Sequence, residues 1–291
     1  MDVYTRITQR IIDQLEEGTV PWQKPWRISL PKNFVSKKTY RGINLLMLAF
    51  AGYSSSCWAT FKQIKRAGGS VNKGEKATPV VYWNWVPSKR SRNVEDKKEP
   101  SAANEEPKGH SAEVHVPFLR YYHVFNLEQT SGIDLPEEEQ ETEFEPIKAC
   151  EKLVSGMPDQ PPINFDGGGR AFYRPITDSV HLPRPSSFKS AEEYYSCLFH
   201  ELIHSTGHKT RLARDGVVGN NHFGTEKYSK EELVAEIGAS FLSGMSGIEK
   251  ATIDNSASYI SGWLKALKDD RKLVVVAAAQ SQKAVDYIKG D

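Results

Sequence analysis

The segment from Ser196 to His208, SCLFHELIHSTGH, contains two histidines four residues apart, His200 and His204, with Glu201 directly after the first. On a helix, residues four apart lie on one face, so the two imidazoles point to one place. Apolar residues flank the histidines, as a buried helix requires. The chain must therefore fold so that this helix is packed in a core while both histidines face a common space.

Two imidazoles at this spacing suit Zn²⁺, and a catalytic zinc site has three protein ligands with a further position open to water. Glu201 is placed to reach that water rather than the metal, so its carboxylate can act as a general base. We predict a zinc site with His200 and His204 as ligands and Glu201 as the catalytic residue; Mn²⁺ is the alternative divalent ion. His208 is a further candidate ligand, but Gly207 predicts that the helix ends before it.

The third ligand is expected from KEELVAEIGASFL, residues 230–242, which predicts a helix with Glu232 and Glu236 on one face. This spacing resembles that of the gluzincin metallopeptidases, in which the first carboxylate binds zinc and the second hydrogen-bonds a ligand histidine. The resemblance implies that Glu232 is the ligand and Glu236 the supporting carboxylate, and the reverse order stays open. His222 and Tyr228, between the two helices, are either oxyanion stabilisers or structural residues.

The order of elements around the motif also carries information. A helix near 146–156 and three short strands within 161–183 precede the motif helix at about 190–207. Helices follow at about 229–244 and within 256–288. This order resembles that of a zincin-type metallopeptidase domain. We expect the strand SVHLP, 179–183, to be able to pair with an extended peptide as an added strand.

Charge is distributed unevenly along the 291 residues. Residues 1–126 carry 20 Lys/Arg and 11 Asp/Glu, a net charge of +9, whereas residues 127–146 carry eight acids and no base. The remainder, 147–291, has 18 of each sign. We therefore predict a domain at 1–133, an acidic linker at 134–145 and a second domain at 146–291. Within the first, 87–113 has almost no apolar residue and predicts a disordered loop.

The first half predicts helices at 3–17, 43–51 and 58–67 and strands at 78–86 and 116–126, with VPWQKPWR, 20–27, extended. A basic surface with interleaved aromatics suits single-stranded DNA, because cations follow the phosphates while rings stack on bases. The candidates are Trp22, Lys24, Trp26, Arg27, Tyr40, Arg41, Trp83, Trp85, Arg120 and Tyr121. Aromatic residues in strands are usually core, so this signal alone is weak. We expect a 1–133 fragment to bind single strands unaided.

Composition limits the class of protein. The chain is 38% hydrophobic and 10% aromatic, which is typical of a globular protein. Its apolar runs are shorter than the roughly 18 residues of a membrane span. The first residues, MDVYTRITQRIIDQLEEG, contain acids and do not resemble a secretory signal. The three cysteines form no metal or redox motif. We expect a cytoplasmic protein with no membrane partner.

Both halves together resemble the ArdC-type antirestriction proteins of conjugative plasmids. The resemblance rests on YTRITQRIIDQLEEG, VPWQKPW, YRGIN, the segment from Trp58 to Gly69 with NKGEKATPVVYW, and FHELIHSTGH with EELVAEIGASFL. It implies an α+β protein, with an N-terminal α/β domain that binds single-stranded DNA and a C-terminal zincin-like metallopeptidase domain. It also implies a role in protecting incoming plasmid DNA during conjugation.

Two functions remain open. The first is a metallopeptidase whose unknown substrate is a host DNA-associated protein, such as a component of the restriction system. The alternative is a non-catalytic DNA-binding shield or replication accessory with a structural or vestigial metal site. The presence of Glu201 favours the first, since a structural metal site has no use for a general base.

Overall fold

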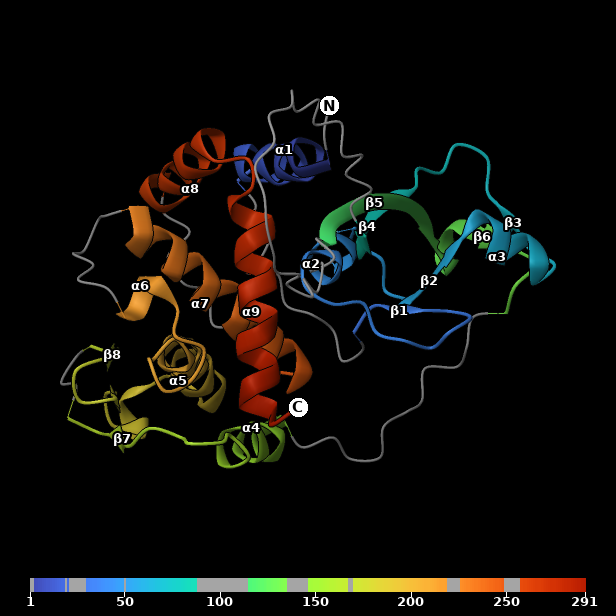
Figure 1. The fold of residues 1–291 in the computed structure, drawn as a ribbon. Helices are drawn as coiled ribbons and strands as arrows, with labels where there is room; N and C mark the ends of the chain where they lie inside the picture. Colours follow the sequence, from blue (N-terminus) through green and yellow to red (C-terminus); the bar gives the residue numbers. More distant parts are fainter. Residues whose placement is uncertain are drawn as a thin grey trace, which may run out of the picture.

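The computed structural model describes residues 3–18, 20, 30–49, 51–87, 115–134, 146–166, 170–218, 226–248 and 257–291. Two groups of elements lie side by side, one built on a sheet and the other mostly helical, with α9 (Leu273–Lys289) between them (Figure 1). The predicted loop at 87–113 and linker at 134–145 lie outside the described residues, apart from Pro87 and Asp134. In the described part, no helix has the length and apolar character needed to cross a membrane.

The first group, the sheet unit, has a four-stranded sheet of order β1-β2-β5-β4. Its strands are β1 (Lys32–Asn33), β2 (Cys57–Thr60), β4 (Thr78–Pro87) and β5 (His115–Asn126). The strand β4 pairs antiparallel with β5 along its whole length, and β1 pairs parallel with β2. A small antiparallel pair, with the 3-10 turn η2 before its second strand, lies beside it: β3 (Ser70–Val71), η2 (Leu127–Gln129) and β6 (Thr130–Ser131). The α+β class is thus confirmed.

The predicted helix at 58–67 is wrong in its first part, which forms β2. Trp58 is 1% exposed and pairs with Asn126 of β5, so burial and strand pairing both favour the extended backbone. The helix α3 (Phe61–Arg66) begins only after Thr60. There the Thr60 side chain accepts a hydrogen bond from Gln63 N, and Gln63 Oε1 accepts one from Thr60 N. This reciprocal capping box fixes the start of the helix.

The helical unit carries a small sheet and six helices among the described residues. These elements are α4 (Pro146–Ser155), β7 (Ile163–Asn164), β8 (Phe172–Arg174), β9 (Ser179–His181), η3 (Pro185–Ser187), α5 (Ala191–Thr206), α6 (Asp215–Val218), α7 (Glu226–Met245), α8 (Ala257–Asp269) and α9. The strand β9 is central in the order β7-β9-β8, with a partner on each side. The expectation that SVHLP adds a peptide strand is therefore wrong for 179–181, because both of its edges are already paired.

The first helix, α1 (Val3–Glu16), packs on the helical unit, although the sequence assigns it to the first domain (Figure 1). Ile7, Ile11 and Ile12 are at most 2% exposed and belong to the same hydrophobic cluster as α7 and α9. Each fully buried isoleucine contributes about 1.5–3 kcal/mol. A fragment ending at residue 133 would expose these side chains, so we no longer expect it to fold on its own.

The YRGIN segment, residues 40–44, leads into α2 (Ile43–Ala49) and contacts both units. Asn44 pairs with the backbone of Val81 on the edge strand β4: its Nδ2 donates to Val81 O at 2.7 Å, and its Oδ1 accepts from Val81 N at 2.6 Å. Gly42 N donates to Gln282 Oε1 of α9 at 3.0 Å. The segment therefore supplies hydrogen-bond partners to the edge strand β4 and connects the sheet unit to α9.

Candidate functional site

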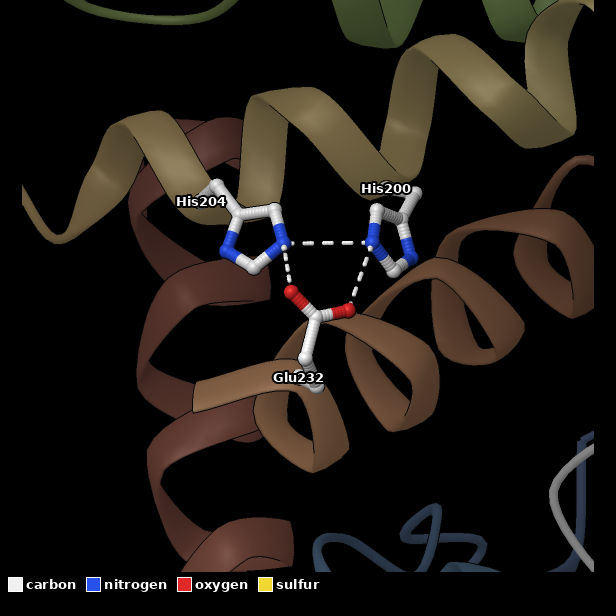
Figure 2. A group of neighbouring side chains, drawn as sticks. All are labelled: His200, His204 and Glu232. Carbon is white, nitrogen blue, oxygen red and sulfur yellow. Dashed lines mark hydrogen bonds and ion pairs between the residues drawn. The ribbon is translucent and has the colours of Figure 1, made fainter. Parts of the chain in front are cut away.

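Three predicted metal ligands come together where α5 crosses α7 (Figure 2). The Nε2 atoms of His200 and His204 are 3.1 Å apart. The carboxylate of Glu232 lies 3.5 Å from each, Oε2 from His200 Nε2 and Oε1 from His204 Nε2. All three ligand atoms lie within 4.8 Å of one another. Two imidazole nitrogens and one carboxylate oxygen are a donor set that fits a divalent ion such as zinc.

Close packing of the two helices produces this geometry. At Gly238 of α7, a Cβ atom would lie 2.7 Å from Ile203 Cδ1 of α5, so the glycine permits an approach that any side chain would block. The helix α5 ends at Thr206 with Gly207 as its cap, as predicted. His208 lies past this end, with Nδ1 2.8 Å from Thr210 Oγ1, and is not in the ligand group.

Opposite charges attract His204 and Glu232 to each other. Burial lowers the pKa of His204, but the carboxylates of Glu231 and Glu232 raise it by more, to about 10. Burial raises the pKa of Glu232, but the two histidines lower it by a larger amount. The pKa of Glu232 is therefore well below its usual range. A histidine must lose its proton to bind a metal ion, so metal and protons compete for this site.

Glu201 is 7% exposed and lies beside the ligand group on α5. Its negative charge contributes to the raised pKa of His204, after the larger effects of Glu231 and Glu232. A buried carboxylate next to a metal site is the arrangement required of a general base. The role of Glu201 as the general base stays a prediction.

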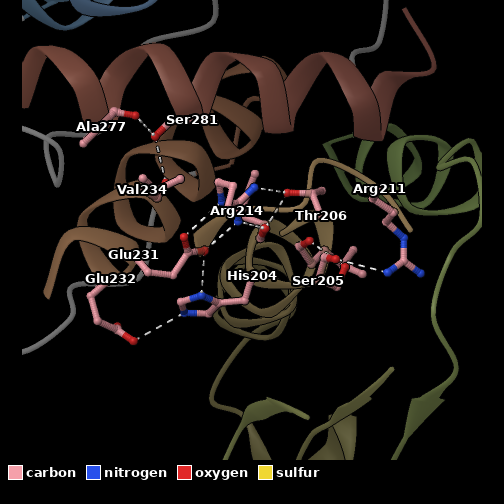
Figure 3. Close-up of polar contacts among 12 residues, drawn as sticks. His204, Ser205, Thr206, Arg211, Arg214, Glu231, Glu232, Val234, Ala277 and Ser281 are labelled. Carbon is pink, nitrogen blue, oxygen red and sulfur yellow. Dashed lines mark hydrogen bonds and ion pairs between the residues drawn. The ribbon is translucent and has the colours of Figure 1, made fainter. Parts of the chain in front are cut away.

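The carboxylate behind His204 is that of Glu231, which the sequence reasoning missed (Figure 3). Glu231 Oε1 lies 3.3 Å from His204 Nδ1. Arg214 donates from Nε to Glu231 Oε2 at 3.0 Å and from Nη2 to Oε1 at 2.6 Å. The same guanidinium donates to Thr206 Oγ1 at 2.6 Å and to Ile203 O at 2.7 Å. Arg214 therefore links the end of α5 to the ligand helix α7.

Glu236, predicted as the supporting carboxylate, is 4% exposed on α7, and its assigned role stays a prediction. The Nδ1 atom of His200 is buried with no hydrogen-bond partner among the described residues. His222 and the side chain of Tyr228 lie outside those residues. In the sequence, the adjacency of Glu231 to Glu232 could have indicated Glu231 as a carboxylate at the site.

Six of the candidate DNA-binding side chains lie outside the described residues: Trp22, Lys24, Trp26, Arg27, Trp83 and Trp85, the last two on β4. Tyr40 is half-buried, and its hydroxyl accepts a hydrogen bond from Asn33 Nδ2 at 3.3 Å. Arg41 forms an ion pair with Asp286 of α9. These last two candidates therefore contribute to packing and to the junction between the units.

The β4–β5 hairpin exposes aromatic rings. Arg120 is exposed and Tyr121 is 42% exposed, whereas Tyr82 and Tyr122, which the sequence reasoning missed, are 52% and 47% exposed. The rings of Tyr82 and Tyr122 meet edge to face, with centroids 6.3 Å apart. Of the nine most exposed large hydrophobic side chains in the described residues, three belong to this hairpin, which makes it a candidate surface for stacking bases.

Comparison with known proteins relates two parts of the chain to known families. Residues 1–125 match the N-terminal domain of the anti-restriction factor ArdC, and residues 159–280 match a zincin-like metallopeptidase. The fold and the site therefore define a protein with a zincin-like metallopeptidase domain and a candidate divalent-metal site at its centre.

The family follows from full-length relatives. The crystal structure of the antirestriction ArdC protein from plasmid R388 is 35% identical, with a TM-score of 0.75 for the metal-free form over 99% of this chain and 97% of that one. Its Mn(II)-bound form gives 0.73. The protein y4eC of Sinorhizobium fredii, which is uncharacterised, is 32% identical over 99% of this chain and 91% of its own length. The chain belongs to the ArdC antirestriction family.

A further relative is much longer. DNA primase TraC of Escherichia coli is 36% identical over 98% of this chain, but the match covers only 27% of that primase. A second TraC primase is 37% identical, with 19% of its length matched. The chain thus spans about a quarter or less of the primases that it resembles.

Proposed function

We propose that this protein is a metal-dependent peptidase that binds single-stranded DNA and protects incoming plasmid DNA from host restriction. The observation that carries the catalytic part is the buried carboxylate of Glu201 beside the group of His200, His204 and Glu232. Ligands alone would suffice for a structural ion, whereas a general base next to them serves the hydrolysis of a bond.

Each residue then has one task. When bound, a divalent ion supplies Lewis acidity, which makes water more acidic and a peptide carbonyl more electrophilic. His200, His204 and Glu232 would hold this ion, and zinc suits their donor atoms. Glu201 takes the proton from the attacking water and then delivers it to the departing amine. Glu231 keeps the ring of His204 in its orientation.

The DNA-binding part is supported by charge and by exposed rings. Residues 1–126 carry a net charge of +9, which attracts phosphates. The exposed tyrosines of the β4–β5 hairpin offer faces on which unpaired bases can stack. Similarity to a protein named DNA primase supports a role at DNA. We expect the peptidase substrate to be a host protein that acts on DNA, such as a restriction component.

The peptidase is tested by mapping new protein N-termini in restricting cells that receive a plasmid. Three forms are compared: wild type, Glu201→Gln, and Glu17→Gln as a control in an exposed glutamate. We expect a set of cleavage products with wild type and the control that is missing with Glu201→Gln. Identical products from all three forms, with metal retained, would exclude peptidase activity from this site.

A further inference from the structure

A cavity of about 300 Å³ lies where α1 passes the base of the β4–β5 hairpin. It is lined by Arg6, Gln9, Arg10, Asp13, Pro79 and His123. None of these residues belongs to the metal site or to the DNA-binding candidates found in the sequence. The lining combines two guanidinium groups and one imidazole with a single carboxylate, so its chemistry favours an anion.

The two arginines lie four residues apart on α1, which places their Cβ atoms about 5–6 Å apart on one face. Arg10 is half-buried. Within the described part of the chain, neither arginine has a carboxylate within 4.0 Å. The carboxylate of Asp13 instead accepts a hydrogen bond from Gln9 Nε2 at 2.8 Å.

A half-buried cation without an anionic partner is costly, because it has lost water without gaining an opposite charge. Burial lowers the pKa of Arg10, and the nearby phenol of Tyr53 offsets only part of this effect. The guanidinium stays protonated at any ordinary pH. A ligand that brought negative charge into the cavity would remove the cost.

An aromatic ring borders the same arginines. Arg6 Cζ lies 4.8 Å from the centroid of the Tyr121 ring, and the His123 ring meets Tyr121 edge to face at 5.4 Å. Tyr121 is 42% exposed, so part of its surface is open to a ligand. Cations next to an open aromatic ring are the combination that proteins use for single strands, in which each phosphate has a base close by.

We propose that this cavity binds a backbone phosphate of single-stranded DNA, with Arg6 and Arg10 as donors to the phosphate oxygens and Tyr121 against the adjoining nucleotide. The guanidinium fork matches phosphate geometry and can donate two hydrogen bonds to it. The inference rests on the proposed DNA binding and assigns it to a definite place, where Arg6 and Arg10 are contacts in addition to the sequence candidate Tyr121.

The test measures the affinity of the full chain for a single-stranded oligonucleotide without a 5′-phosphate, by fluorescence anisotropy over a range of salt concentrations. The variants are Arg6→Gln and Arg10→Gln, and Arg66→Gln is the control, since it removes one exposed charge from α3. We expect roughly tenfold weaker binding or more for each cavity variant, as for loss of a charge-assisted hydrogen bond. The salt slope should fall by about 0.7 for one lost phosphate contact.

The possible results distinguish the assignment of the cavity from the proposed DNA binding. Cavity variants that bind like Arg66→Gln would overturn the cavity assignment while DNA binding stands. A wild type that binds no single strands would overturn the proposed DNA binding, and the cavity assignment with it. An effect seen only with 5′-phosphorylated oligonucleotide would overturn the backbone assignment in favour of a terminal phosphate. If Arg10→Gln fails to fold by circular dichroism, Arg6→Gln decides, because Arg6 is exposed.

Discussion

Glu231 Oε1 lies 3.3 Å from Nδ1 of His204, on the opposite side of the imidazole from Glu232. Nε2 of the same ring points at His200, so the two ring nitrogens have separate tasks. A carboxylate at Nδ1 places the proton there and leaves Nε2 as the metal donor. Arg214 in turn fixes Glu231 with two hydrogen bonds. The orientation of His204 thus depends on a pair of residues outside the group of His200, His204 and Glu232.

This arrangement predicts that Glu231→Leu lowers metal affinity about 10–100-fold, the usual effect of removing a ligand's hydrogen-bonding partner. The variant should also lose about 3–5 kcal/mol of stability, because Arg214 would stay buried without its partner. Metal affinity is measured by competition with a chelating indicator, and stability by urea unfolding. The double variant Arg214→Met/Glu231→Leu should recover stability but not metal affinity. Recovery of both would contradict a positioning role.

The ligand assignment predicts how metal content responds to substitution. His200→Ala and His204→Ala should lose the stoichiometric ion after purification, whereas Glu201→Gln should keep it, because the base is not a ligand. Glu232→Ala should weaken binding more than Glu236→Ala, since Glu232 is the carboxylate 3.5 Å from both histidines. Elemental analysis and metal titration give the values. The reverse ranking of the two glutamates would exchange their roles.

The junction at YRGIN predicts a stability effect at Asn44. Asn44→Ala removes the hydrogen-bond partners of the backbone N–H and C=O of Val81, a residue that is 6% exposed. Each buried polar group left unpaired costs about 1–3 kcal/mol, so we expect a loss of about 2 kcal/mol or more. Asn72→Ala is the control, because its side chain makes one exposed hydrogen bond, with Ser131. Equal effects of the two substitutions in urea unfolding would refute the structural role of Asn44.

The sequence predicts the parts of the site that are local. The spacing of His200 and His204 defines one helix face, and Gly207 indicates the end of the helix. The partner of His204 could not be found in this way, because the orientation of α7 against α5 decides whether Glu231 or Glu236 faces the ring. That orientation depends on contacts such as Gly238 against Ile203.

The fold also has features that depend on residues far apart in the sequence and so could not be predicted from local patterns. Apolar spacing correctly predicts α1, but the surface against which it packs, α8 and α9, lies at the far end of the chain. The sequence predicts a helix from Trp58 onward, whereas the structure has Trp58 in β2. Its strand state comes from pairing with Asn126, which no local pattern reveals.

We expect Asp178 to make the free energy of unfolding depend on pH. This residue has a left-handed backbone with a φ of 46°. Arg211 donates to its two oxygens at 2.7 and 3.0 Å, and the Tyr173 hydroxyl donates at 2.8 Å. Burial raises the pKa of Asp178, but these hydrogen bonds lower it by more. Its stabilising effect is therefore present above the unfolded-state pKa of about 3.9 and is lost as the pH falls through the lower folded-state value.

Asp178→Asn should accordingly lower the free energy of unfolding at neutral pH, with a difference from wild type that shrinks below about pH 4. Asparagine adopts the left-handed region readily, so the backbone is preserved. Urea unfolding of the metal-free protein between pH 3 and 7 measures the difference, with exposed Asp134→Asn as the control. A difference that is constant over this range would show that the Asp178 charge is not coupled to folding.

The proposed function requires the carboxylate of Glu201 for antirestriction. The direct measurement is the efficiency with which an unmodified plasmid establishes itself in a restricting host that contains wild type, Glu201→Gln or Glu17→Gln, with metal content and DNA affinity determined for each. We predict that Glu201→Gln keeps its metal and its DNA affinity but loses protection, while Glu17→Gln protects like wild type. Full protection by metal-loaded Glu201→Gln would contradict the claim and show that the protein acts as a DNA-binding shield.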